Sequence, residues 1–321
     1  MESLTKNKQD KNVIKQMVEK AFPSTGCDKI EELKEGFFNV AYYITLTNGE
    51  HVILKVAPHP DARIMSNEKN IMFSEVDSLR LVKRETEVPI PDILYYDDSH
   101  EICPSDYFFM SVIEGGSFST LGESLTEEDR KGIQKQIGEY NYSMNQITGE
   151  RFGYYGQQDL QGDCWFEVFR DMLQLAFYDA RKANIEIPYK EEEILSLLER
   201  DKSCFDEVTI PRFVHWDLWA GNVFVKDNMV TGVIDFERCI WGDPLLEVGF
   251  RCYERNVDFL EGYGLTSLTK EEERRANWYD IYLFQIMILE GEYRQYETDD
   301  AYNWAKEMLV KCVSAIDLLV N

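Results

Sequence analysis

Three side chains with oxygen donors stand close together in the stretch 213–237, namely Asp217, Asn222 and Asp235. Asn222 opens one strand-like run and Asp235 closes the next, so an antiparallel hairpin places them nearly opposite each other, about 5–8 Å apart at Cβ. Such donors suit Mg²⁺, which completes its shell with water and phosphate oxygens. Asp217, on the loop before the hairpin, can orient a substrate hydroxyl for attack on a phosphate. The stretch therefore indicates phosphoryl transfer assisted by Mg²⁺.

The elements that precede this stretch predict a small antiparallel sheet behind an N-terminal helix that ends near Ala21. Asn48-Gly49 carries the signal of a type I′ hairpin turn between two of the strands. Each expected strand is a short apolar run bounded by polar or turn residues. The strands are predicted over residues 30–35, 40–46, 51–56, 93–96 and 107–113.

A helix is predicted between the third and fourth strands, because apolar residues recur at helical spacing from about Asp61 to Lys83. Glu68 and Glu75 fall on the same face as these apolar residues. A buried carboxylate without a partner is costly. At least one of the two acids is therefore expected to pair with a cation.

The second half of the sequence is predicted to be mainly helical, with strand and loop only near 213–235. Gly115-Gly116 interrupts the pattern after the fifth strand and marks the expected boundary between two lobes. We therefore predict an α+β fold with a sheet-containing N-terminal lobe over residues 1–113 and a mainly helical C-terminal lobe over 114–321. The helices are expected over residues 127–145, 164–183, 190–202, 270–293 and 300–319.

The order His215-x-Asp217-x-x-x-x-Asn222, followed by Asp235, resembles the signature of the aminoglycoside phosphotransferase and choline kinase superfamily. The resemblance implies a protein-kinase-like fold, with ATP and Mg²⁺ as cofactors. It also implies that Asp217 is the catalytic aspartate, that Asn222 and Asp235 bind the metal, and that His215 braces the loop. The sequence departs from the family at Trp216, where glycine is frequent.

The same resemblance extends to the predicted sheet, where Lys55 matches the strand lysine that holds the α- and β-phosphates of the nucleotide. Its implied partner is Glu75, with Glu68 as the alternative. Two backbone contacts with the nucleotide are implied as well, one from a turn that covers the phosphates and one from the hinge after the fifth strand. The residues concerned are Gly36 and Asn39 in the turn and Ser111 and Ile113 in the hinge.

The composition of the chain indicates which kinds of partner it can bind and in which compartment it is expected. The net charge of −25 opposes binding to nucleic acid or anionic membranes and favours cationic ligands. The seven cysteines include no CxxC pair, which disfavours a disulfide framework and a zinc site and suits reduced thiols in the cytoplasm. No apolar run reaches the roughly 20 residues that cross a bilayer. We therefore predict a cytoplasmic protein without a membrane segment.

The acceptor is predicted from the acidic residues that follow Asp235, which suit a cationic, aminoglycoside-like small molecule with a hydroxyl group. The loop 217–222 is also similar to that of fructosamine kinases. Choline, homoserine and macrolide acceptors remain open, as do a catalytically inactive nucleotide-binding relative, the choice between ATP and GTP, and the oligomeric state. The acids concerned are Glu237, Asp243, Glu247, Glu254, Asp258, Glu261, Glu290, Glu292, Asp299 and Asp300.

Overall fold

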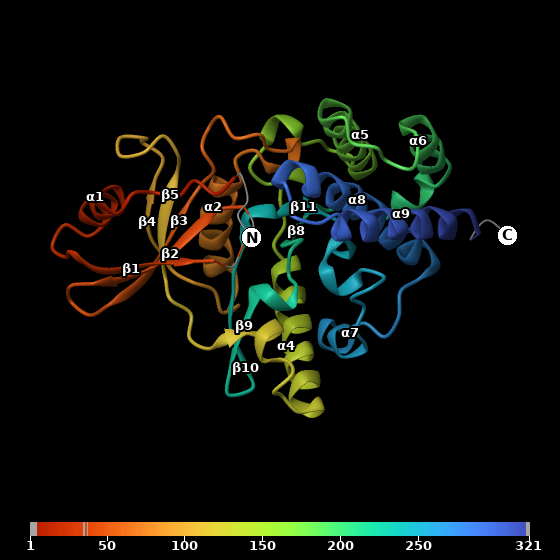
Figure 1. Ribbon diagram of the computed structural model, residues 1–321. Helices are drawn as coiled ribbons and strands as arrows, with labels where there is room; N and C mark the ends of the chain where they lie inside the picture. Colours follow the sequence, from red (N-terminus) through yellow and green to blue (C-terminus); the bar gives the residue numbers. More distant parts are fainter. Residues whose placement is uncertain (1–4, 35, 37, 319–321) are drawn as a thin grey trace.

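The computed structural model describes residues 5–34, 36 and 38–318 and shows two lobes, a sheet-containing lobe at the left of Figure 1 and a mainly helical lobe at the right. The first lobe contains an antiparallel five-stranded sheet in the order β1-β2-β3-β5-β4. Its elements are α1 (Lys11–Ala21), β1 (Cys27–Leu33), β2 (Val40–Leu46), β3 (His51–Val56), α2 (Ile71–Glu85), β4 (Ile93–Asp97) and β5 (Tyr107–Ser111).

Helix α1 covers one face of this sheet. The residues of β2 alternate between buried and partly buried, as expected for a strand with one face in a core. The buried side chains of α1 pack in the same hydrophobic cluster as those of β2, β3 and β5, and they are Ile14, Met17 and Val18.

The turn between β2 and β3 differs from the predicted type I′ turn. A type I′ turn needs a positive φ at both central residues, but of Asn48 and Gly49 only Gly49 has one, +87°. The amide of Gly49 donates to the Leu46 carbonyl at 2.9 Å. The loop is therefore a three-residue connection with glycine in the left-handed position, and the type I′ prediction is wrong.

The predicted helix over 61–83 begins only at Ile71. Asn70 precedes it in the left-handed conformation, with φ +55°, and separates α2 from the 3₁₀ turn Ser66–Glu68. Within that turn the Glu68 carboxylate accepts a hydrogen bond from the backbone amide of Met65 at 2.9 Å. The backbone break places Glu68 and Glu75 on separate elements rather than on one helix face.

The helical lobe confirms the long helices expected from the sequence, with boundaries shifted by at most two residues. A short helix, α7 (Val257–Tyr263), and several two- or three-residue strands escaped the periodicity analysis because they are too short to show a period. The long helices are α4 (Glu127–Asn145), α5 (Trp165–Ala183), α6 (Glu191–Arg200), α8 (Lys270–Arg294) and α9 (Asp300–Leu318), with the four-residue α3 (Phe118–Leu121) preceding them.

Two small sheets support the loops of this lobe. One has the order β10-β9-β6 and the other the order β7-β11-β8. Across the described part of the chain, no helix has both the length and the apolar composition needed to cross a membrane. The strands are β6 (Gly116–Ser117), β7 (Gly153–Tyr154), β8 (Arg212–Val214), β9 (Val223–Lys226), β10 (Met229–Val233) and β11 (Ile240–Gly242).

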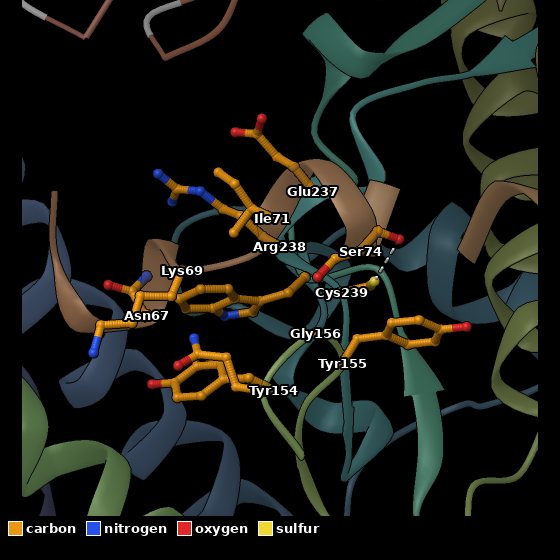
Figure 2. A pocket seen from close by; sticks show the side chains of 12 residues that line it. Asn67, Lys69, Ile71, Ser74, Tyr154, Tyr155, Gly156, Glu237, Arg238 and Cys239 are labelled. Carbon is orange, nitrogen blue, oxygen red and sulfur yellow. Dashed lines mark hydrogen bonds between the residues drawn. The ribbon is translucent and has the colours of Figure 1, made fainter. Parts of the chain in front are cut away.

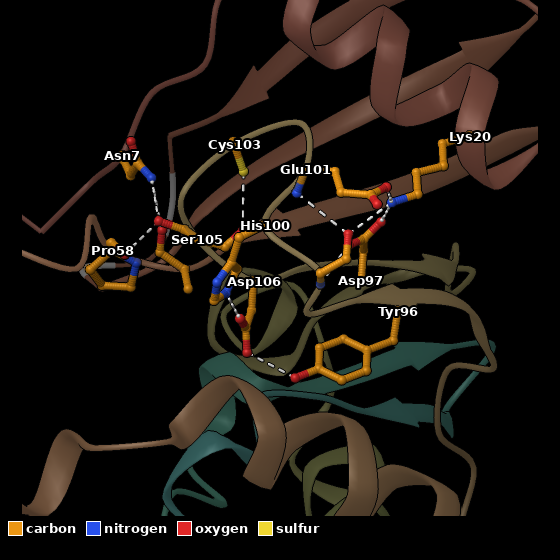
Figure 3. Close-up of polar contacts among 12 residues, drawn as sticks. Asn7, Lys20, Pro58, Tyr96, Asp97, His100, Glu101, Cys103, Ser105 and Asp106 are labelled. Carbon is orange, nitrogen blue, oxygen red and sulfur yellow. Dashed lines mark hydrogen bonds and ion pairs between the residues drawn. The ribbon is translucent and has the colours of Figure 1, made fainter.

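A buried carboxylate, Asp97 at the end of β4, ties α1 to the sheet, as the contact with Lys20 in Figure 3 shows. Lys20 Nζ lies 2.7 Å from Asp97 Oδ2, and the Tyr107 hydroxyl donates to the same oxygen at 2.9 Å. The amide and hydroxyl of Ser99 donate to Asp97 Oδ1 at 2.9 Å and 2.6 Å. Burial by itself would raise the pKa of Asp97, but these donors outweigh it and hold the pKa well below its usual range.

We expect Asp97→Asn to lower the free energy of unfolding by about 1.5–3 kcal/mol at neutral pH, the usual contribution of hydrogen bonds to a charged group. Because the folded pKa of Asp97 lies below its unfolded value, this contribution is present above the unfolded pKa of about 3.9 and is lost as the pH falls. Urea denaturation over a pH series measures it, with the exposed Asp98→Asn as control. If the difference in free energy of unfolding between wild type and Asp97→Asn stayed undiminished in acid, the stabilising role assigned to the ionised Asp97 would be contradicted.

Candidate functional site

The hairpin of β9 and β10 brings three of the predicted site residues together. Val223 pairs with Val233, and the amide of Ile234 donates to the Asn222 carbonyl at 3.0 Å, so Asn222 and Asp235 lie at the same end of the hairpin. The Asn222 amide group donates to the carbonyl of Asp217 at 2.9 Å and to its carboxylate Oδ2 at 3.1 Å. The predicted placement of Asn222 and Asp235 at one end of an antiparallel hairpin is thus confirmed.

His215 is fully buried and engages both ring nitrogens within the loop. Its Nε2 lies 3.0 Å from the carbonyl of Ile234, and its Nδ1 accepts from the backbone amide of Asp217 at 3.2 Å. The carbonyl can only accept, so the proton resides on Nε2. The ring therefore connects the loop to the hairpin, which agrees with a bracing role.

Trp216 has a φ of +66°, the left-handed conformation that glycine adopts without strain. This explains why glycine suits the position, and here the strain is offset by packing. The indole is 3% exposed and stacks on Tyr282, with ring centroids 5.4 Å apart. The Trp216 carbonyl accepts a hydrogen bond from the buried Arg251 guanidinium. The unusual tryptophan is thus compatible with an ordered loop.

Lys55, in β3, has its ammonium group buried between two acids. Its Nζ lies 2.5 Å from Oε1 of Glu75 in α2 and also forms an ion pair with Asp235. Burial by itself would lower the pKa of Lys55, but the charges of Asp235 and Glu75 outweigh it and raise the pKa above its usual range. The predicted pairing with Glu75 is confirmed, whereas Glu68 pairs with Arg294 at 2.8 Å.

Glu237 adds a third carboxylate near Lys55. Its Oε2 accepts a hydrogen bond from Asn39 Nδ2 at 2.6 Å, which connects it to the turn before β2. Burial raises the pKa of Glu237 to about 8, with further contributions from the charges of Asp235 and Glu75. Three acids thus lie near one lysine, and an additional cation would lower the pKa of Glu237 and favour its ionised form.

The residues implied for backbone contacts occupy two separate segments. Gly36 has a φ of +92°, which favours glycine, while residues 35 and 37 on either side of it lie outside the described part of the chain. The amide of Ser111 donates to the Asp92 carbonyl at 2.9 Å, so this amide is already engaged within the sheet. The amide of Ile113 has no hydrogen-bond partner among the described residues, so it is available to a base.

A buried chain of charges behind the loop that contains Asp217 was not anticipated from the sequence. Arg238 pairs with Glu290 of α8 and lies over the ring of Trp216, 5.8 Å from its centroid. Arg294, also from α8, lies 3.3 Å from Glu290 and 2.8 Å from Glu68. The sequence offers one signal for these charge pairs. Arg238 follows Asp235 by only three residues, which places a cation close to the predicted site.

These arginines affect the candidate catalytic carboxylate. Burial raises the pKa of Asp217, and the positive charges of Arg238 and Arg251 oppose the rise. A raised pKa makes a carboxylate a better proton acceptor, while the opposing cations favour its ionised form.

The acids expected to hold a cationic acceptor do not form one surface. Asp243 is buried and pairs with Arg275 at 2.8 Å. Glu247 is fully buried and accepts backbone hydrogen bonds, and Glu290 is neutralised by the two arginines described above. The electrostatic argument for a cationic acceptor therefore weakens, because a paired carboxylate has little attraction left for a ligand.

Two neighbouring cavities lie beside this region. In Figure 2, Tyr154 and Tyr155 lie on one side of the first cavity, and Ile71 and Arg238 lie on the other. Its volume of about 10 Å³ is roughly that required by one water molecule. The second cavity, of about 370 Å³, shares two lining residues with the first and has apolar, cationic and acidic walls. It is lined by Ile64, Ser66, Lys69, Asn70, Gln157, Asp159, Leu160 and Leu175.

The donors at the end of the hairpin fit a magnesium ion. The Asn222 amide nitrogen is used to hold Asp217, which leaves the amide oxygen for another partner. Asp235 contributes a carboxylate that is 30% exposed and therefore accessible. Both ligands are oxygen atoms, as Mg²⁺ requires, and the surrounding charge is negative.

Residues 29–279 match the family described as the phosphotransferase enzyme family, APH. A subtelomeric hrmA-associated cluster protein of Aspergillus fumigatus is 30% identical over 149 residues, which are 46% of this chain and 28% of that protein. A probable ketoamine kinase of Enterococcus faecium is 27% identical over 206 residues, covering 61% of this chain and 65% of that protein. The matches thus span less than two thirds of the length of either relative.

Solved structures resemble this chain over nearly its whole length. The streptomycin–ATP–APH(2″)-IIa ternary complex aligns with a TM-score of 0.60 and 18% identity, covering 96% of each chain. A thermostable mutant of aminoglycoside phosphotransferase APH(4)-Ia, in ternary complex with ADP and hygromycin B, aligns with a TM-score of 0.66 and 15% identity, covering 94% and 98%. The two-lobed, protein-kinase-like fold expected from the sequence is confirmed. The exact lobe boundary after residue 113 remains a prediction.

Proposed function

This chain belongs to the phosphotransferase enzyme family, and we propose that it transfers the γ-phosphoryl group of ATP, with Mg²⁺, to a hydroxyl group of a small molecule. The observation that carries this proposal is the convergence of Asp217, Asn222 and Asp235 at one end of the hairpin, beside the buried Lys55. Phosphoryl transfer requires mainly positioning and charge stabilisation, and this set of residues provides both.

Asn222 and Asp235 would hold the magnesium ion, which when bound neutralises charge on the phosphates. Lys55 supplies a fixed positive charge on the same side, held in place by Glu75. Asp217 receives the proton of the acceptor hydroxyl at its carboxylate, and the Asn222 amide keeps that carboxylate oriented. The base of the nucleotide is assigned to the hinge, where the Ser111 carbonyl and the Ile113 amide would contact it. The phosphates are assigned to the turn that contains Gly36 and Asn39.

The acceptor we propose is a polyhydroxylated amine of the aminoglycoside type. The support comes from the relatives, since two of the similar structures contain streptomycin and hygromycin B. It does not come from a shared acidic surface, because the acids near the catalytic loop are paired within the protein.

A second candidate acceptor is a ketoamine, which is an amine that has been glycated by a sugar. The similar protein of Enterococcus faecium is a probable ketoamine kinase, and its match covers a larger share of this chain than that of the Aspergillus protein. The two candidates share the same chemistry, a hydroxyl group on a polyhydroxylated compound that also carries an amine. Their amine carries the positive charge that distinguishes them from neutral sugars.

We expect ADP release with Mg²⁺ and ATP to accelerate when an aminoglycoside or a fructosamine is added, and to change little with a neutral sugar or a protein. A panel that also includes choline, homoserine and a macrolide, run at low and high salt, measures this. The cationic acceptor is expected to bind more weakly at high salt because ions screen its contacts. The variant Asp217→Asn serves as the control for enzyme-dependent turnover.

The panel also separates the alternatives. Selective turnover of an uncharged macrolide or sugar would reject the amine acceptor while leaving the kinase proposal in place. No turnover with any acceptor, together with no binding of ATP in calorimetry, would reject the kinase proposal in favour of a catalytically inactive relative.

A further inference from the structure

Two cysteines and one aspartate, none of which is assigned to phosphoryl transfer, meet in the helical lobe. Cys252 lies in the segment before α7, Asp280 in α8 and Cys312 in α9. Their sulfur and carboxylate ligand atoms all lie within 4.8 Å of one another. The spacing of the cysteines in the sequence did not indicate this cluster, because each comes from a different element.

The cluster is anchored by hydrogen bonds from the backbone and from one neighbouring side chain. The amide of Cys252 donates to Asp280 Oδ2 at 3.0 Å, which fixes both the segment and one carboxylate oxygen. The side-chain amide of Asn277 donates to the carbonyl of Cys312 at 2.9 Å, which sets the position of α9 along α8. Helices α8 and α9 run side by side in Figure 1. The three ligand residues are therefore positioned by the fold rather than by chance contact of mobile side chains.

One atom of the cluster has no partner. Asp280 is 2% exposed, and its Oδ1 is buried without a hydrogen bond. Leaving a buried carboxylate oxygen unpaired costs free energy, and such atoms in native proteins usually indicate an unseen water, ion or functional group. The unpaired oxygen belongs to the same carboxylate that lies within reach of the two thiols.

We propose that Cys252, Asp280 and Cys312 form a binding site for a zinc ion. Sulfur ligands select zinc over magnesium or calcium, which prefer oxygen alone. In a tetrahedral site with Zn–S distances of about 2.3 Å, ligand atoms are about 3.8 Å apart. The observed limit of 4.8 Å thus requires a contraction of about 1 Å.

The chemistry of the cluster also fits its surroundings. On binding, each thiol loses its proton to solvent, so two thiolates and a carboxylate face a doubly charged ion. Arg251 and Arg255 lie near Asp280 and offset the remaining negative charge. Cys252 is exposed, which gives the ion a path from solvent and leaves the fourth position to water. The site is therefore exchangeable rather than closed.

A disulfide between Cys252 and Cys312 is the competing explanation for the two thiols. It requires the sulfurs to approach to about 2.05 Å, and it would leave Asp280 Oδ1 without a partner. The metal ion satisfies all three groups at once, which is why we favour it.

Cobalt titration of the full chain, stripped of metal by a chelator and kept reduced with a phosphine, tests the proposal. We expect one Co²⁺ per chain, a thiolate-to-cobalt charge-transfer absorption in the near ultraviolet, and displacement by Zn²⁺. Cys252→Ser and Cys312→Ser should abolish this absorption, and Asp280→Asn should weaken binding at least about tenfold. Cys164→Ser is the matched control, since Cys164 is also exposed but lies outside the cluster.

Cys252 is exposed, so its serine variant tests the site even if the variants at the two buried positions fail to fold. An absorption that is undiminished in Cys252→Ser, or none in the reduced wild type, would overturn the proposal. So would an intact mass showing that Cys252 and Cys312 are disulfide-linked in the purified protein, combined with no cobalt binding after reduction. Because these measurements need no acceptor, their outcome is independent of the phosphotransferase proposal.

Discussion

Asp217→Asn is expected to lower kcat for phosphoryl transfer by about 100- to 10,000-fold, the range associated with loss of a general base. The amide cannot take the proton of the acceptor hydroxyl, although its oxygen can still accept the hydrogen bond from Asn222. Binding of ATP with Mg²⁺ should change little, since Asp217 is assigned to the acceptor rather than to the metal. Steady-state ADP release and calorimetry measure the two effects separately.

A matched control for this substitution is Asp227→Asn in the turn of the same hairpin. Asp227 is exposed and has a φ of +49°, a conformation that asparagine tolerates, so the change removes one charge at little structural cost. It should leave kcat close to the wild-type value. A kcat in Asp217→Asn within a few-fold of wild type would show that Asp217 is not the general base.

Asp235→Asn is expected to remove most of the gain in nucleotide affinity that Mg²⁺ provides. The affinity measured with Mg²⁺ should fall by about 10- to 100-fold. A neutral amide is a much weaker ligand than a carboxylate for a hard divalent ion. Lys55 keeps its second partner, Glu75, so the sheet around it should remain folded. Calorimetry with ADP, with and without Mg²⁺, measures the loss, and thermal unfolding checks the fold.

The two aspartate variants are most informative when compared. If Asp217 acts on the acceptor and Asp235 on the metal, only Asp235→Asn should weaken magnesium-dependent nucleotide binding. An equal loss of nucleotide affinity in both variants would reject this division of roles. Unchanged affinity in Asp235→Asn would instead remove Asp235 from the metal site and leave Asn222 to be tested in the same way.

The sequence was sufficient to predict the parts of the site that depend on local structure. Asn222 and Asp235 flank two short strands, and antiparallel pairing across a tight turn leaves few alternatives for where they meet. The apolar periodicity of the long helices and the strand pattern around Lys55 also predicted their elements correctly, because period and burial are directly linked. The left-handed Asn70 was not visible in that periodicity, and it moved the start of α2 to Ile71.

Apart from the pair of Lys55 and Glu75, which the family resemblance implied, only the tertiary structure decided which distant side chains became partners. The pairing of Glu290 with Arg238 removed an acid expected to bind the acceptor, because the end of α8 packs behind the loop that contains Asp217. The approach of Cys252 and Cys312 likewise depends on how α9 and the segment before α7 both lie against α8. Periodicity establishes that a helix buries one face, but the neighbour against which that face packs is set by the combined packing of all elements. The long-range charge pairs of Glu290 and the cysteine cluster were therefore decided by the fold, whereas the meeting of Asn222 and Asp235 at one end of the hairpin was already determined by the order of the residues.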